Sequence, residues 1–492
     1  MRMRLTESVS GTAATARIAF LHEGRDPAAG LRPSVRAAVR SAIKATGFRG
    51  KQKEIAAGGG PLGTWTLCGL GKAEASPSRV RAALRRAVRD AVKRTPRIAL
   101  AFDAGLSEDS FRALLPQIGS ADYRFDRYKT LPSEPRVRSD ASVQVLPPPG
   151  LPARSLAEAV TRAQIIADAV RWARDVGNMP GNELGPLELA REAKALTKRH
   201  GLRFRALDKR EIEREKMGGL LAVNAGSARP PVFLIGEYKP AKSRGTAVVV
   251  GKGVTFDSGG ISLKPAASMG EMKYDMMGAA TAFACLAAAR ALALPVRVVA
   301  LAPVTENMPG GTATRPGDIL RMRNGKTVEV DNTDAEGRLI LADALSYAEK
   351  FAPDVLLDFA TLTGAVVIAL GHECAGLMTP DDELARQLTQ AGETTGERLW
   401  RLPLWSDYRE NLKSEWADMK NTGGRAAGTI NAGVFLHEFV PPGVPWAHLD
   451  IASVAHFEKE QGGWPAGATG FGVALTIEFL RRRFGAPGRS SA

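Results

Sequence analysis

Short apolar runs alternate with amphipathic stretches along most of this 492-residue sequence, and that alternation restricts its fold more than any other feature. In the first part of the chain, apolar runs at 14–21, 64–70 and 98–102 are separated by amphipathic stretches at 32–45 and 80–92. Short apolar runs predict buried strands, whereas apolar residues spaced three or four apart predict helices packed against them. Residues 14–145 are therefore expected to form an α/β domain.

The same alternation continues after residue 230. The apolar runs that predict strands are 231–236, 246–250, 296–301, 327–330 and 355–359. Helical stretches at 278–292 and 338–350 separate some of these runs. This order predicts a second α/β domain, a mixed sheet covered by helices on both faces, with ligands bound at the carboxyl ends of its strands.

A proline-rich segment lies between the two regions. Residues 147–152 are Pro-Pro-Pro-Gly-Leu-Pro, a composition typical of a stiff linker. The chain is also longer than one ordinary domain. We predict an N-terminal domain over 1–145, a linker over 146–154, and a second domain over 155–488 that opens with a long helix at 155–176.

The positive charge is concentrated in the first domain. Residues 1–150 contain 26 Lys and Arg against 13 Asp and Glu, a net charge of +13, whereas the whole chain has +15. Ser76 is the expected N-cap of the helix that follows it. The basic residues placed largely opposite the apolar face of this helix are Arg79, Arg85, Arg86, Arg89 and Lys93. Two interpretations remain open, a solvated helix face and a phosphate-binding surface.

Cysteine content and hydropathy predict a cytoplasmic protein with no membrane segment. The chain has three cysteines, too few for a disulfide framework and typical of a reducing compartment. Its longest apolar tract, 277–304, is interrupted by Arg290, Pro295 and Arg297, which favours a buried helix followed by a strand over a bilayer span.

Charged residues gather where the strand at 327–330 gives way to a helix. Asp334 and Glu336 are two residues apart, so they project to one side of an extended chain, where their charges repel unless a cation lies between them. Two upstream segments, 251–265 and 272–278, supply further carboxylates and lysines after another predicted strand. An oxygen-rich set of this kind suits a paired site for divalent metals. No HExxH motif occurs, and we expect His448 to be a packed, hydrogen-bonded histidine.

These segments resemble the leucine aminopeptidase family of two-metal exopeptidases. The residues that carry the resemblance are Lys252, Asp257, Lys264, Asp275, Asp334, Glu336 and Arg338. The run Asn-Thr-Asp-Ala-Glu-Gly-Arg at 332–338 is close to that family's signature, and the similarity continues through 358–365 and 446–452. The resemblance implies that 155–488 is a catalytic dinuclear metallopeptidase domain and that the protein is a homohexamer.

The resemblance also implies roles for individual residues. Asp257 and Glu336 would bridge two metal ions; Asp334 would complete one site, and Lys252 with Asp275 the other. The ions would be Mn²⁺ or Zn²⁺, with Co²⁺ and Mg²⁺ as alternatives. Lys264 would stabilise the oxyanion, and Arg338 would hold a bicarbonate ion that serves as general base. The residues expected to contact substrate are Met272, Asn332, Thr361, Leu362 and Gly364.

The function expected is a metal-dependent hydrolase, an aminopeptidase that releases N-terminal residues from peptides with a leucine-type preference. Two alternatives remain open. One is a DNA-binding regulator that uses the basic N-terminal domain and has peptidase activity as a secondary property. The other is a two-metal phosphoesterase, because paired metal sites also serve phosphoryl transfer.

Overall fold

The fold is that of a computed structural model, which describes residues 1–485 except 7, 10–14, 73–76, 131–140, 152, 268, 462, 463 and 465. The chain divides into two compact units. The first comprises Met1–Arg171 together with Thr394–Gly396 and Glu460–Pro465, and the second comprises the remainder. This division falls inside helix α4 (Ala153–Gly177), and the domain boundaries drawn from the sequence stay a prediction.

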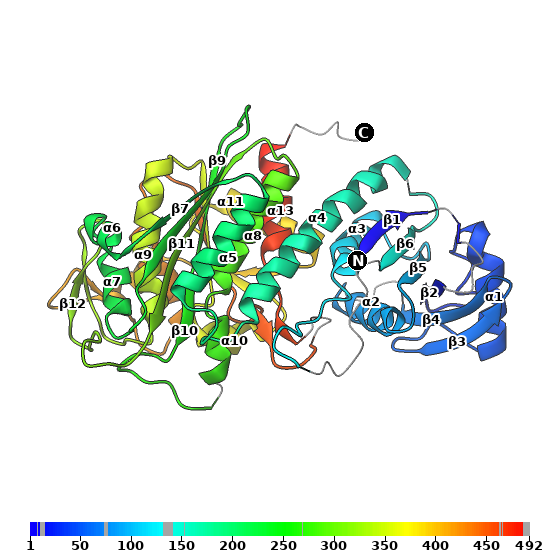
Figure 1. Ribbon diagram of the computed structural model, residues 1–492, viewed down its shortest axis with the longest axis horizontal. Coiled ribbons are helices and arrows are strands. Elements are labelled where there is room, and N and C mark those ends of the chain that lie inside the picture. The colour runs from blue at the N-terminus through cyan, green and yellow to red at the C-terminus, as the bar shows by residue number, and fades with distance from the viewer. Residues whose placement is uncertain are drawn as a thin grey trace. The chain divides into compact units, whose positions relative to one another are not determined.

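The first unit is built on a six-stranded sheet (Figure 1). Its strands, in spatial order, are β1 (Arg2–Leu5), β6 (Ser142–Leu146), β5 (Arg97–Phe102), β2 (Thr15–His22), β4 (Gly63–Gly71) and β3 (Ile55–Gly60). All neighbouring strands are parallel except β3 and β4.

Helices cover both faces of this sheet. On one face Phe20 packs in a cluster with residues of α2 (Pro77–Val92), α3 (Glu108–Gly119) and α4. On the other face Leu21 packs with residues of α1 (Pro33–Thr46). Successive residues of a strand point to opposite faces, so the apolar run of β2 supplies both cores. The α/β fold expected for this region is confirmed.

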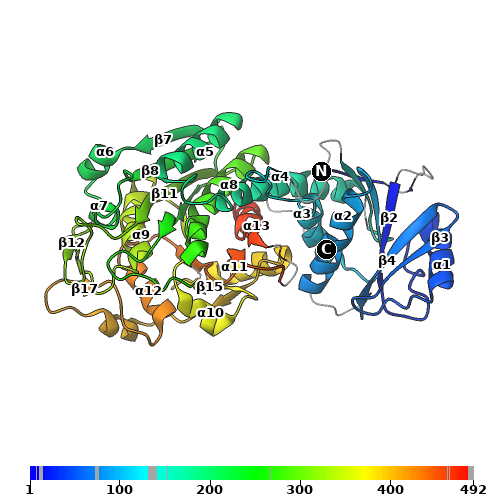
Figure 2. The same cartoon turned by 60° about the horizontal axis from the view of Figure 1, so that its bottom comes forward.

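The second unit contains a nine-stranded mixed sheet (Figures 1 and 2). The order along it is β16 (Leu399–Arg401), β15 (Ala375–Met378), β18 (Trp446–Asp450), β14 (Val355–Ala360), β9 (Thr246–Gly251), β11 (Arg297–Asn307), β8 (Val232–Tyr238) and β7 (Arg203–Leu207), and β10 (Gly253–Asp257) also pairs with β11. The central strands β18, β14, β9 and β11 are parallel, and β15, β8 and β7 add antiparallel pairs.

Helices lie on both faces of this second sheet as well. Ile235 belongs to a core cluster shared with α9 (Glu336–Tyr347), whereas a side chain at its neighbour Gly236 would meet Leu286 and Phe283 of α8 (Met277–Ala291). The predicted mixed sheet with helices on both faces is therefore confirmed. The remaining helices of the described chain are α5 (Pro186–Arg199), α6 (Lys209–Arg214), α7 (Gly218–Asn224), α10 (Gly364–Leu370), α11 (Asp382–Thr395), α12 (Gly428–His437), α13 (Val473–Phe484), and the 3-10 helices η1 (Met269–Tyr274), η2 (Ala348–Phe351) and η3 (Ser406–Leu412).

One predicted strand does not belong to the main sheet. The run at 327–330 forms β13 (Thr327–Glu329), which pairs with β12 (Ile319–Arg321) and β17 (Met419–Lys420) in a separate three-stranded sheet. Val328 is the one buried side chain in β13, and the tight turn at Gly325 pairs the strand with its neighbour in sequence. A further two-stranded sheet consists of β19 (His456–Phe457) and β20 (Gly467–Ala468).

The prediction that the basic residues of α2 face solvent is wrong for Arg85. This side chain is 7% exposed, and its guanidinium donates to Gln117 Oε1 at 2.5 Å and lies 5.3 Å from the centre of the Trp464 ring. Gln117 and Trp464 therefore cover part of the α2 surface that the amphipathic pattern predicted to be exposed to solvent. Arg86 and Lys93 are exposed, as expected, and Arg89 lies 3.4 Å from Glu460. Ser76 and the Arg79 side chain lie outside the described residues.

Two smaller expectations are also tested by the described part of the chain. No helix there is both long and apolar enough to cross a membrane. Cys68, Cys285 and Cys374 are all free thiols, as expected from their number.

Candidate metal centre

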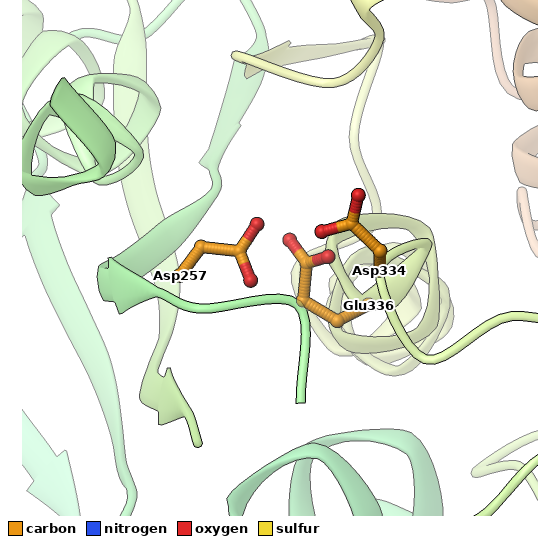
Figure 3. A group of neighbouring side chains, drawn as sticks. All are labelled: Asp257, Asp334 and Glu336. Atoms are coloured by element: carbon orange, nitrogen blue, oxygen red, sulfur yellow. The ribbon is translucent and has the colours of Figure 1, made fainter. Parts of the chain in front are cut away.

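Three carboxylates converge at the carboxyl end of the second sheet. Asp257 is the last residue of β10, Asp334 lies in the loop after β13, and Glu336 is the first residue of α9. One oxygen from each lies within 4.8 Å of the others, and Figure 3 shows the three side chains pointing toward one another. The loop holds this geometry because the Asp334 N–H donates to Asn332 Oδ1 at 2.8 Å. The expectation that Asp334 and Glu336 converge is confirmed.

Two lysines and a fourth carboxylate complete the cluster. Lys252, which directly follows β9, places its Nζ 2.8 Å from Asp275 Oδ2 and 2.8 Å from Glu336 Oε1. Lys264 Nζ lies 2.8 Å from Asp257 Oδ2 and also contacts Asp334. Four carboxylates and two ammonium groups leave a net charge of −2.

The electrostatics of the cluster favour added positive charge. Burial raises the pKa of Asp275, Asp334 and Glu336, and neighbouring carboxylates raise them further. Burial would lower the pKa of Lys252 and Lys264, but the carboxylates around them raise it overall. Keeping these buried carboxylates ionised therefore costs free energy, and positive charge beside them reduces that cost.

Three carboxylate oxygens of the cluster have unused acceptor capacity. Asp275 Oδ2, Asp334 Oδ1 and Glu336 Oε1 are buried, and none receives a hydrogen bond of acceptable geometry from the described residues, although each lies at ion-pair distance from a lysine. Buried acceptors in a folded protein are nearly always satisfied. Oxygen donors of this kind suit divalent cations, so the residues present fit the metal pair that the sequence implied.

Arg338 is the third residue of α9 and lies beside the cluster, but it makes no ion pair with the cluster among the described residues. It is 7% exposed, and its Nη1 donates to Asn421 O at 2.7 Å. Burial lowers the pKa of Arg338 to about 10, while Glu336 and Asp450 oppose the change. Arg338 therefore stays a cation at neutral pH and cannot itself act as a base.

A cavity of about 690 Å³ opens next to this cluster. Of the residues expected to contact substrate, Asn332, Leu362 and Gly364 line it, together with Asp334 and Arg338. The other two do not line it. The Thr361 hydroxyl donates to Asp275 Oδ1 at 2.7 Å and its carbonyl accepts from Lys252 Nζ at 2.9 Å. Met272 lies in η1, three residues before Asp275. The substrate residues therefore divide between the two ends of the site.

Sequence reasoning missed two asparagines that hold the site. Asn307, at the carboxyl end of β11, donates from Nδ2 to Asp257 Oδ1 at 2.8 Å and to Thr333 O at 3.0 Å. Asn421 is fully buried, and its Oδ1 accepts from the Asp331 N–H at 2.8 Å while its Nδ2 donates to Asn332 O at 2.7 Å. A polar residue at the end of a buried central strand was a usable signal for Asn307. No local pattern in the sequence indicated Asn421.

Two further acidic residues form a buried layer near the loop 361–363. Asp450 accepts from the Leu362 N–H at 3.1 Å and from the Thr363 hydroxyl at 2.7 Å, so it fixes the loop that ends β14. His448 is fully buried, and its Nδ1 lies 2.5 Å from Asp358 Oδ1. The prediction that His448 is a packed, hydrogen-bonded histidine is confirmed.

Comparisons with known proteins agree with this geometry. Residues 171–477 match the family model described as the cytosol aminopeptidase family, catalytic domain, and residues 24–132 match the N-terminal domain of the same family. These matches cover both predicted α/β domains.

Individual relatives and solved structures are also similar. The probable cytosol aminopeptidase of Chlorobaculum tepidum is 49% identical over 381 residues, which is 76% of this chain and 75% of that protein. The probable cytosol aminopeptidase of Syntrophotalea carbinolica is 51% identical over 363 residues, 74% of this chain and 73% of that protein. The structure of the bottromycin maturation enzyme BotP in complex with Mn has a TM-score of 0.83 and 36% identity, covering 96% of this chain and 100% of that one. The chain thus belongs to the cytosol aminopeptidase family and is a metal-dependent exopeptidase.

Proposed function

We propose that this aminopeptidase works through two divalent metal ions held by Lys252, Asp257, Asp275, Asp334 and Glu336. The observation that carries the proposal is the convergence of Asp257, Asp334 and Glu336, two of which, Asp334 and Glu336, have a buried oxygen with unused acceptor capacity. Glu336 pairs with Lys252 and Asp257 pairs with Lys264, which supports the proposal that these two carboxylates would be shared by both ions. Asp334 would serve one ion, and Asp275 with Lys252 the other. The positive charge of the ions would lower the pKa of Lys252, so that it could bind as a neutral amine. When bound, such a pair supplies Lewis acidity and an activated water.

Lys264 and Arg338 are the two residues proposed to act on the reaction. The ammonium of Lys264 is partly exposed beside Asp257 and Asp334, where it can stabilise the oxyanion that develops from the scissile carbonyl. Arg338 is a buried cation at the wall of the cavity. It can hold a bicarbonate ion, and that anion would take the proton from the attacking water.

The substrate is a peptide with a free α-amine. Met272 and Thr361 lie at the Asp275 end of the site, whereas Asn332, Leu362 and Gly364 line the cavity at the Asp334 end. We propose that the first group contacts the N-terminal residue, with a leucine-type preference, and that the second contacts the rest of the peptide.

The identity of the ions, the oligomer and the compartment are further parts of the proposal. Mn²⁺ or Zn²⁺ suits the donor set, with Co²⁺ and Mg²⁺ as alternatives, and the similar enzyme BotP has been solved in complex with Mn. A homohexamer follows from the resemblance to the leucine aminopeptidases. A cytoplasmic location is supported by the three free thiols and by the names of the relatives.

The basic charge of residues 1–150 supports a second, independent activity, binding of nucleic acid. With Arg85 buried, the cations that remain for this role are Arg86 and Lys93, which are exposed, and Arg89, which is half-buried and pairs with Glu460. A mobility shift with duplex DNA that is lost on raising the salt would support it. The family assignment favours peptides over the phosphate esters of the other alternative.

The main proposal is tested with leucine p-nitroanilide and its N-acetylated form. Only the free amine should be hydrolysed, and chelation followed by removal of the chelator should abolish turnover while circular dichroism stays unchanged. Adding back Mn²⁺, Zn²⁺ or Co²⁺ should restore activity. Equal cleavage of the two substrates, or full activity after metal removal confirmed by elemental analysis, would overturn the proposal.

A further inference from the structure

The cavity beside the metal centre is lined by one arginine, Arg425, that has neither a hydrogen bond nor an ion pair with any described residue. Its ionisable lining residues are Asp334, Arg338 and Arg425, and most other lining residues are small or apolar. Asp334 contacts Lys264, and Arg338 is buried and bonded to Asn421 O. Arg425 is exposed and makes no hydrogen bond or ion pair with any residue in the described part of the chain. Its guanidinium is therefore available to a ligand.

The backbone that carries Arg425 is held in place although its side chain is free. Asn431 is fully buried in α12, and its Nδ2 donates to Gly423 O at 3.2 Å and to Ala426 O at 2.9 Å. These carbonyls lie on either side of Arg425 in the chain. Asn411 donates to Asn431 Oδ1 at 3.0 Å and so fixes the orientation of that amide. The loop therefore presents a free guanidinium from an anchored position, which limits the entropy lost when a ligand binds.

The position of the cavity indicates which part of a substrate it receives. It borders the centre at Asp334 and Arg338 but not at Asp275 or Lys252. A peptide whose amine and first residue occupy the Asp275 end would extend its remaining residues into this cavity. The volume of about 690 Å³ is in the range of sites for small ligands, about 300–1,000 Å³. In a dipeptide bound in this way, the group that would reach this space is the α-carboxylate.

We propose that Arg425 recognises the free α-carboxylate of short peptide substrates and so sets a preference for dipeptides. A guanidinium can pair with a carboxylate through two parallel hydrogen bonds, which gives both attraction and a fixed orientation. The inference rests on the proposed function, because it takes the metal centre as the place where the peptide amine and scissile bond are held. It adds a specificity residue that the metal ligands and Lys264 do not supply.

The test compares two substrates that differ in this carboxylate alone, leucylglycine and leucylglycinamide, with leucine p-nitroanilide as a reference. For Arg425→Ala we expect kcat/KM on leucylglycine to fall about tenfold, mainly through KM, which corresponds to ~1.4 kcal/mol. Activity on the amide and the anilide should stay within about twofold of the wild type, by the same scale. Arg425→Lys should restore part of the loss, because it keeps the charge without the two-pronged geometry.

Arg386→Ala is the matched control, since Arg386 is an exposed arginine of α11 that pairs with Glu383 and does not line the cavity. It should leave all three substrates unaffected. An equal loss on the dipeptide and its amide in Arg425→Ala would overturn the inference, as would no loss on either. Failure of the wild type to hydrolyse any of the three would instead overturn the proposed function.

Discussion

Helix α9 contains two buried carboxylates, Glu336 and Asp343, which differ in the groups that contact their oxygens. Asp343 is fully buried, and its Oδ1 and Oδ2 accept main-chain N–H groups of Arg323 and Leu220, each at 2.9 Å. Glu336, two turns earlier, has no main-chain donor to its side chain among the described residues; its Oε1 lies 2.8 Å from Lys252 Nζ, and it faces Asp257 and Asp334. A carboxylate whose oxygens accept main-chain N–H groups joins parts of the fold, whereas one that lacks such donors and lies among other carboxylates is stabilised by cations beside it.

The largest effect that this comparison predicts is that of Glu336→Ala. The side chain lies between the carboxylates and Lys252, so its loss should weaken both metal sites together. We expect a loss of kcat larger than the ~10²–10³-fold typical of one oxyanion donor. Elemental analysis should show that both ions are depleted.

The matched control for this variant is Glu349→Ala, since Glu349 lies just after α9 with its side chain 58% exposed and pairs only with Arg323 among the described residues. It should retain both metal and activity. Full metal occupancy in Glu336→Ala would contradict the bridging role.

Lys264→Ala should separate catalysis from metal binding. Removing this ammonium leaves Asp257 and Asp334 with less neutralising charge, which should preserve or increase their affinity for a cation. The rate should fall by about 10²–10³-fold if the group stabilises an oxyanion. Single-turnover kinetics on metal-loaded protein would measure this, and loss of metal from the variant would show that Lys264 has a different role.

Asn307→Ala should have an intermediate effect. Its Nδ2 donates to Asp257 Oδ1 and to Thr333 O, so it orients one proposed ligand and the loop that carries another. Residues that orient metal ligands typically contribute about 10–100-fold to metal affinity or activity. Titration of the metal-free variant with Mn²⁺ should show weaker binding. Asn324→Ala, on the exposed β12–β13 turn, is the control and should bind as the wild type does.

The sequence predicted the elements and the ligand cluster because both depend on local patterns. The change from a strand pattern to a helical one after residue 330 predicted that Asp334 and Glu336 converge, and the structure has them together with Asp257 at the end of β10. Contacts between segments that lie far apart in the sequence leave no local pattern from which they could be predicted. Arg85 looked exposed because the indole that covers it, Trp464, comes from near the other end of the chain. Asn421 joins the ligand loop across a long separation for the same reason.

The lack of a local pattern for long-range contacts also explains why the strand at 327–330 was predicted in the main sheet. The run at 327–330 has the apolar alternation of a strand, but nothing in it specifies a partner. Its pairing with β17 brings the segment that ends in Asn421 beside the ligand loop, so the small sheet positions the site without joining the main one.

The smallest effect on activity should come from Asp343→Asn, which tests whether the carboxylate bound by main-chain N–H groups has a structural role alone. An asparagine has one acceptor oxygen, so one of the two main-chain N–H groups should lose its partner, at a cost of about 1–3 kcal/mol in the free energy of unfolding. Because the remaining contacts keep α9 in place, kcat/KM should change little. Urea unfolding at neutral pH would measure the stability, and Asp407→Asn, at an exposed carboxylate of η3, is the control.

The same variant makes a prediction about pH. Burial raises the pKa of Asp343 from 3.8 to about 7, while its main-chain donors oppose the rise. Since the folded protein holds this proton more tightly than the unfolded chain does, the contribution to stability is full below pH 3.8 and is lost as the pH rises to about 7. Asparagine does not titrate. The difference in the free energy of unfolding between wild type and Asp343→Asn should therefore shift in favour of the variant from pH 5 to pH 7. A difference that stays constant over that range would show that the main-chain donors keep Asp343 ionised, and that its burial is fully compensated.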